Sequence, residues 1–173
     1  MNIRKALLEP PVQLKPEAAK IAAYAASSPK RFDELTQCFL SNEYRLQQRA
    51  AWCVSMAVRK NNKLIQPYIN TLVQQLNRKD VHNAIHRNSL RILQDIDIPE
   101  AYTGELMNAC FNFVESPQTP IAIKAFALTV LGNLAMSVPE IRPEIKLIIN
   151  FNIGHESPAF KVRAREVLKK IGL

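Results

Sequence analysis

The sequence predicts an all-α protein built as a stack of helix pairs, and three observations support this. Four twelve-residue strings align without gaps, and their starts at Leu46, Ile85, Ile123 and Phe160 lie 39, 38 and 37 residues apart. A helical pattern that recurs every ~38 residues is typical of helix-pair solenoids. No stretch alternates apolar and polar residues over the length of a strand, and proline (11 residues) is frequent where glycine (4 residues) is scarce.

Positions 1, 5, 8, 9 and 12 of the four strings are apolar or small in every copy, which is the spacing of one helix face. The strings read LQQRAAWCVSMA, IHRNSLRILQDI, IKAFALTVLGNL and FKVRAREVLKKI. We expect these five positions to form the core, and we call the helices that carry them the B helices. Position 5 stays small, which predicts that a neighbouring helix passes close to it. Its occupants are Ala50, Ser89, Ala127 and Ala164.

An amphipathic A helix precedes each B string, and three of the A helices share a helix breaker in register. The breakers are Pro67 in KLIQPYINTLVQQL, Gly104 in YTGELMNACFNF and Pro143 in EIRPEIKLIINF. Proline is tolerated in the first turn of a helix and kinks it further along, so each breaker either starts or bends its helix. The first A helix, from Phe32, is shorter. Upstream, the Ala-rich stretch KPEAAKIAAYAASS from Lys15 predicts an N-terminal capping helix.

These repeats resemble the HEAT-like, armadillo-type helical repeat family. The resemblance rests on the period, on the proline in helix A and on the pattern SPxFKVRAxxVLKKIG from Ser157 to Gly172. It implies a right-handed α–α superhelix of about four helix pairs plus an N-terminal capping helix. The expected divisions are an N-terminal segment with the capping helix at 1–30 and HEAT-like repeats over 31–173, at 31–61, 62–97, 98–138 and 139–173.

The net charge of +8 is sorted between the two helix layers. The segments that contain the B helices carry twelve Lys or Arg and one acid, which gives a net charge of +11. The segments that contain the A helices carry six Lys or Arg and eleven acids, which gives a net charge of −5. In this family the B helices line the concave face, so the resemblance implies a basic groove that attracts an acidic partner. The B segments are 44–60, 81–94, 119–138 and 158–173, and the A segments are 31–43, 62–80, 97–115 and 140–156.

The B-helix positions opposite the core stripe are expected to face this groove. Trp52, the only tryptophan, would offer its ring to a base, a lipid headgroup or a peptide aromatic, or else pack against the cap or an adjacent helix. A charged surface that serves only solubility is the alternative explanation of the basic residues. The candidate groove residues are Arg45, Arg49, Trp52, Arg59, Arg87, Arg91, Lys124, Arg165 and Lys169.

Two functions follow from this surface. The first is a non-enzymatic scaffold that binds a protein or peptide partner, and the alternative is sequence-independent nucleic-acid binding along the same groove, as in HEAT-like DNA-repair modules. The third B helix carries Lys124 as its single charge, among apolar residues such as Phe126 and Leu128. This neutral interruption would break a track of phosphate contacts, so the sequence favours the protein partner.

No catalytic constellation or cofactor motif is apparent. His82 and His86 have the i, i+4 spacing of zinc ligands, but HNAIH lacks the Glu of an HExxH motif, so a structural pair is the preferred interpretation. The three cysteines are far apart and lie in apolar runs, which argues against a disulfide framework. The HEAT-like alkylpurine DNA glycosylases use a groove aspartate and several tryptophans, and this chain offers neither a second tryptophan nor a groove-facing aspartate in its third or fourth repeat.

The stretches QQRAAW, RILQDIDIP and AIKAFALTVL also resemble short bacterial HEAT-like proteins without an established role. Some proteins of that group are described as adenylosuccinate lyase. The mobile serine loop of that enzyme, of the type GSSxMPxKxNP, has no counterpart in this chain. We therefore expect no enzymatic activity and no cofactor.

The most apolar stretch, Ile121 to Val138, is expected to be a buried central helix rather than a membrane span. It contains Lys124 and Asn133, and it falls in register with three polar-faced repeats. The N-terminus MNIRKALLEPPVQ lacks the apolar core and the cleavage site of a signal peptide. The expectation is therefore a cytoplasmic protein.

Overall fold

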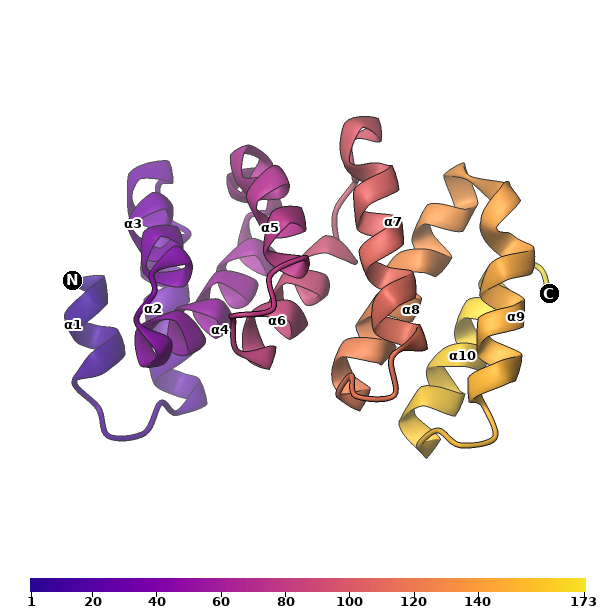
Figure 1. Ribbon diagram of the computed structural model, residues 1–173. Helices are drawn as coiled ribbons and strands as arrows, with labels where there is room; N and C mark the ends of the chain where they lie inside the picture. The colour runs from indigo at the N-terminus through magenta and orange to yellow at the C-terminus, as the bar shows by residue number, and fades with distance from the viewer. The chain divides into compact units, whose positions relative to one another are not determined.

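The chain is helical, as the repeat pattern predicts, and contains no β-strand. The computed structural model describes residues 1–173 (Figure 1). The chain divides into two compact units, unit 1 at residues 1–92 and unit 2 at residues 93–173. None of its helices is long and apolar enough to cross a lipid bilayer. The α-helices are α1 (Ile3–Leu8), α2 (Lys15–Ala25), α3 (Pro29–Leu40), α4 (Tyr44–Lys60), α5 (Ile69–Leu76), α6 (Asn83–Leu93), α7 (Glu100–Glu115), α8 (Ile121–Ser137), α9 (Arg142–Asn152) and α10 (Pro158–Lys170), and the 3-10 helices are η1 (Asn62–Tyr68) and η2 (Pro139–Ile141).

Unit 1 is organised around α4, the first B helix. Helices α1, α2, α3 and η1 all pack against it. Its five repeat positions from Leu46 to Ala57 are buried, and Ala51 and Val58 on a neighbouring face are buried as well. A helix that is covered on more than one side needs apolar or small residues around much of its circumference, and the small residues of α4 let several helices approach it closely.

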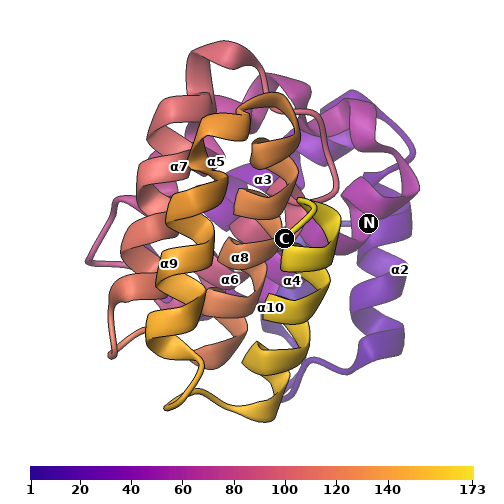
Figure 2. The ribbon, with the colours of Figure 1, turned by 90° about the vertical axis from the view of Figure 1, so that its right-hand side faces the viewer.

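Unit 2 is organised in the same way around α8, the third B helix. Helices α7, α9 and α10 pack against it, and Figure 2 shows α7 and α9 on one side with α8 and α10 on the other. The approach of α10 to α8 is especially close. A Cβ atom placed on Gly132 of α8 would lie 3.0 Å from Cγ1 of Val167 on α10. The pair of helices therefore leaves little room for a side chain at Gly132.

The structure confirms the predicted core. Every residue at positions 1, 5, 8, 9 and 12 of the four strings is buried except Ile96 and Leu168, which are half-buried. All four occupants of position 5 are fully buried, as expected for the place where helices approach most closely. Residues that the period of ~38 aligns therefore occupy equivalent positions in the core.

Of the three helix breakers of the A helices, the two prolines behave alike and Gly104 differs from them. Pro67 lies inside η1, directly before α5, and Pro143 is the second residue of α9. Both prolines therefore lie at or before the start of an α-helix, where the missing backbone N–H breaks no α-helical hydrogen bond. Gly104, by contrast, lies within the continuous helix α7, because glycine keeps its N–H and weakens a helix without interrupting it.

The N-terminal region contains one helix that the sequence predicts and one that it did not. The Ala-rich stretch forms α2, with Pro16 in its first turn. Its buried residues Ala18, Ile21 and Ala22 follow the spacing of positions 5, 8 and 9 of the B strings, and α2 packs against α4. The short helix α1 was not predicted. It is fixed by burial of Ile3 and Leu7, and α1 contacts both α3 and α4.

The close contact between α8 and α10 predicts that a large side chain at Gly132 destabilises the protein. A Gly132→Leu substitution forces α8 away from Val167, and we expect a loss of about 1–3 kcal/mol in the free energy of unfolding, measured by urea denaturation. The matched control is Gly104→Leu, because a Cβ atom at Gly104 meets nothing within 4 Å. We expect the control to gain about 0.5–1 kcal/mol from helix propensity. Equal effects of the two substitutions would contradict this account of the packing.

Candidate functional site

A concave pocket in unit 1 brings together several of the residues that the sequence predicts for the groove. The pocket has a volume of about 460 Å³. It lies among α4, α6 and the loop between α1 and α2, and we call it the Trp52 pocket. Its lining residues are Pro11, Val12 and Gln13 from the loop, Gln48, Arg49 and Trp52 from α4, and Arg87, Asn88 and Arg91 from α6.

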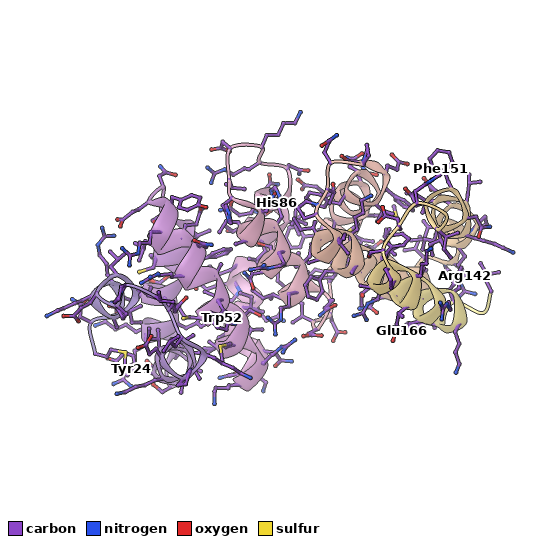
Figure 3. All side chains as sticks on the ribbon, turned by 90° about the horizontal axis from the view of Figure 1, so that it is seen from below. Tyr24, Trp52, His86, Arg142, Phe151 and Glu166 are labelled. Atoms are coloured by element: carbon purple, nitrogen blue, oxygen red, sulfur yellow. The ribbon has the colours of Figure 1, made fainter.

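Trp52 reaches the pocket because it lies on α4 one turn after Gln48, beside the buried positions Ala51 and Cys53 (Figure 3). The indole is half-buried, so part of it packs against the protein while part lines the pocket. The opposing loop residue Val12 is 64% exposed. An aromatic ring and an apolar loop side chain therefore form an open, partly apolar pocket wall.

Arg49 fixes the loop that forms the other wall. Its Nη1 donates to the carbonyl oxygens of Leu7 and Pro10, both at 2.7 Å, and its Nη2 donates to the carbonyl oxygen of Pro11 at 2.8 Å. Arg49 is only 9% exposed, and burial, followed by the charge of Arg45, lowers the pKa of its guanidinium. Three of its donors are thus used within the protein, so this arginine shapes the pocket rather than offering itself to a ligand.

Arg45 supports the same loop from the surface. Its Nη2 donates to the carbonyl oxygens of Pro10 at 2.8 Å and Pro11 at 3.1 Å. The sequence predicts that Arg45 and Arg49 face the groove, whereas the structure shows both of them bound to the loop. Helical spacing indicates the direction of a side chain but not the chain segment that it meets, which explains the difference.

Arg87 and Arg91 bring positive charge to the α6 side of the pocket. They are one turn apart on the helix, Arg87 is exposed, and Arg91 is half-buried. Between them lies Asn88, which is buried and donates through Nδ2 to the carbonyl oxygen of Ala84 at 2.8 Å. No Asp or Glu lines the pocket, so the local charge is positive.

A family model of the HEAT repeat domain matches residues 5–171. The chain belongs to the HEAT repeat family. The HEAT match includes most of α1 and all of α2, which precede the stretch 31–173 where the sequence resemblance was noted. Neither the curated proteins nor the solved structures contain a match.

The remaining groove candidates of this HEAT protein lie outside the Trp52 pocket. Arg59 is exposed near the C-terminal end of α4. Arg165 and Lys169 are exposed on α10 in unit 2, on the same helix as Glu166 (Figure 3). Each of these side chains thus carries its charge on the surface of its own unit.

Lys124 differs from the expectation that it faces a groove. The side chain lies inside unit 2, only 3% exposed, and its Nζ forms an ion pair with the Glu156 carboxylate. Glu156 lies between α9 and α10, and its side chain is 12% exposed. A buried ammonium is stable only when it is paired, so Lys124 ties α8 to the loop before α10 instead of presenting charge to a ligand.

The two candidate metal ligands, His82 and His86, take part in local structure. Nδ1 of His82 accepts a hydrogen bond from the backbone N–H of Ala84 at 3.1 Å, and its ring packs edge-on against Tyr44. Nε2 of His86 donates to the carbonyl oxygen of Arg78 at 2.9 Å, and burial lowers the pKa of this imidazole. No group of three or more His, Cys, Asp or Glu side chains gathers anywhere in the chain in a way that could hold a metal ion.

All three cysteines are buried thiols. Burial raises the pKa of Cys53 to about 12, and Sγ of Cys53 accepts a hydrogen bond from Nε2 of Gln13 at 3.3 Å. Burial also raises the pKa of Cys38 and of Cys110 above the usual range. A nucleophilic thiolate is therefore disfavoured at each of these positions near neutral pH.

The sequence analysis missed the loop contribution to the site. Pro11, Val12 and Gln13 line the pocket, and the signal that was available is the pair Pro10–Pro11, a stiff and extended element with free carbonyl oxygens. Two arginines one turn apart on α4 are suitable donors for such carbonyls. Without the fold, however, nothing in the sequence brings residues separated by more than 30 positions together.

The hydrogen bonds from Arg49 to the end of α1 and the following loop predict that α1 becomes less stable when Arg49 loses its charge. An Arg49→Met substitution keeps the aliphatic stem but removes the Arg49 donor from the carbonyl of Leu7 and leaves the carbonyls of Pro10 and Pro11 with Arg45 alone. We expect a loss of about 1–3 kcal/mol and faster amide hydrogen exchange throughout α1. Lys60→Met, at the exposed end of the same helix, is the control and should change neither quantity. Unchanged exchange in α1 would show that Arg49 does not hold it.

The Lys124–Glu156 pair predicts a non-additive double mutant. Lys124→Met leaves the Glu156 carboxylate without its partner in a largely buried place, and we expect a loss of about 3 kcal/mol in thermal or urea unfolding. Adding Glu156→Leu removes the orphaned charge, so the double variant should recover most of that loss. Additive losses would contradict a coupled buried pair.

Proposed function

We propose that this HEAT-repeat protein is a non-catalytic scaffold that binds an acidic segment of a partner protein at the Trp52 pocket. The observation that supports the proposal is the convergence of Trp52, Arg87 and Arg91 around one pocket whose lining contains no carboxylate. These three residues come from two helices, and the sequence predicts that all three face the groove, because they lie opposite the core stripe of their B helices.

The chemistry of the pocket suits a peptide with both acidic and apolar side chains. A guanidinium binds a carboxylate through two parallel hydrogen bonds, and Arg87 is exposed and able to do so. The Trp52 ring and Val12 provide an apolar surface for a neighbouring side chain. A volume of about 460 Å³ falls in the range of roughly 300–1,000 Å³ in which ligand pockets are usually found.

Nucleic acid would also meet an arginine and an aromatic ring here, but nucleic-acid binding needs a continuous basic surface. Several of the basic residues expected in that surface are engaged within the protein. Arg45 and Arg49 donate to the loop carbonyls, and Lys124 is buried in an ion pair. Arg87, the exposed arginine of the pocket, suits one carboxylate better than a continuous track of phosphates. The protein partner is therefore favoured.

The single tryptophan allows a direct test, because its fluorescence reports on the pocket alone. We would titrate the protein at low salt with a synthetic peptide in which leucines are flanked by Glu, with the matched Lys peptide, and with a mixed-sequence single-stranded DNA. We expect a saturable change of Trp52 emission with the Glu peptide. Arg87→Glu should weaken this binding by about tenfold or more, because it replaces a charge-assisted contact by repulsion.

Lys60→Glu is the matched control, since it changes the net charge equally from an exposed position of α4 outside the pocket lining. It should alter the affinity by no more than about twofold. Saturable binding of the DNA without binding of the Glu peptide would replace the proposal by the nucleic-acid function. Equal weakening by Arg87→Glu and Lys60→Glu, or no emission change with the Glu peptide, would overturn it.

A further inference from the structure

Helix α9 in unit 2 exposes two large apolar side chains that no packing within the protein explains. Phe151 is 81% exposed and Leu147 is 71% exposed, the highest values among the exposed large hydrophobic residues of the chain. They are spaced i, i+4, so they lie on one face of the helix. The core-facing residues Ile145 and Ile149 of the same helix are buried. Figure 3 shows Phe151 at the periphery of unit 2, on the opposite side from Glu166 of α10.

The two side chains border a second pocket, with a volume of about 460 Å³. Buried Ile148 forms its floor. We call this surface the α9 patch. The residues that line it are Glu115, Glu144, Leu147, Ile148, Phe151 and Asn152.

The charged residues of the α9 patch are both carboxylates. The C-terminal ends of α7 and α9 point the same way (Figure 1); Glu115 is the last residue of α7, whereas Glu144 is in the first turn of α9. The C-terminus of α7 adds a partial negative charge beside Glu115. Lys146 projects about 100° around the helix from Leu147 and does not line the patch. The apolar strip from Glu144 to Phe151 extends over roughly 10 Å, at about 1.5 Å per residue.

We infer that the α9 patch binds a segment of another protein in which an apolar or aromatic residue is flanked on both sides by Lys or Arg. The apolar residue would occupy the pocket between Leu147 and Phe151, and the flanking cations would meet Glu115 and Glu144. A second copy of this chain docking through the same patch would place carboxylates against carboxylates, because symmetric dimers juxtapose identical surfaces. The charge pattern therefore selects a basic partner segment over self-association, and it is opposite in sign to that of the Trp52 pocket.

The inference can be tested with a phage-displayed library of random linear peptides selected on the whole protein. We expect enrichment of peptides with an aromatic or aliphatic residue between basic residues. A synthetic version of an enriched peptide should lose on the order of tenfold or more in affinity with Phe151→Ser, since exposed aromatic anchors dominate such interfaces. It should also lose affinity, and much of its salt dependence, with Glu144→Gln.

Val162→Ser is the matched control, because Val162 is 50% exposed on α10 and does not line the patch. It should leave the affinity unchanged, and since all three substituted side chains are exposed, circular dichroism should show intact helices for every variant. No enrichment, enriched peptides without basic residues, or equal binding by Phe151→Ser would overturn the inference. A dimer seen by light scattering that becomes a monomer with Phe151→Ser would also overturn it, because the occupant would then be a second copy.

Discussion

The structure depends on one constraint, namely that a B helix must be packed on several sides at once. Helix α4 meets α1, α2 and α3, and α8 meets α7, α9 and α10. Such an arrangement works only if the contact positions carry small or well-fitting apolar residues, which is why position 5 is always small and why Gly132 faces Val167. The positions of each B helix outside these contacts meet loops or solvent.

This constraint explains how the basic residues of the B helices divide into two groups. Arg45, Arg49 and Lys124 meet chain segments outside their own helices and satisfy carbonyls or a carboxylate there. Arg49 and Lys124 are buried, and a buried cation must find such partners because its desolvation is otherwise too costly, whereas Arg45 makes its contacts from the surface. Arg87 remains exposed at a pocket. The net positive charge of a helix layer therefore overstates the positive charge that is exposed to a ligand.

The parts of the fold that could be predicted from the sequence are those governed by spacing within one helix. The buried positions from Leu46 to Ala57 follow directly from helical periodicity, and so does the place of Trp52 beside Gln48. The roles of Arg49 and Lys124 could not be predicted in this way, because they depend on the Pro10–Pro11 loop and on Glu156, whose positions follow from tertiary packing. Helix α1 escaped prediction because it is too short for a periodic pattern and is held by burial of Ile3 and Leu7.

The Trp52 pocket and the α9 patch differ in the layer that supplies them, in charge and in the kind of anchor that they accept. One is built from B helices and combines an indole with arginines, while the other is built from A helices and combines Leu147 and Phe151 with carboxylates. A segment that satisfies the first carries the wrong charge for the second, since a like-charge contact costs binding free energy instead of supplying it. Sorting of charge between the helix layers thus gives the two proposed sites opposite charge, so they call for partner segments of opposite charge.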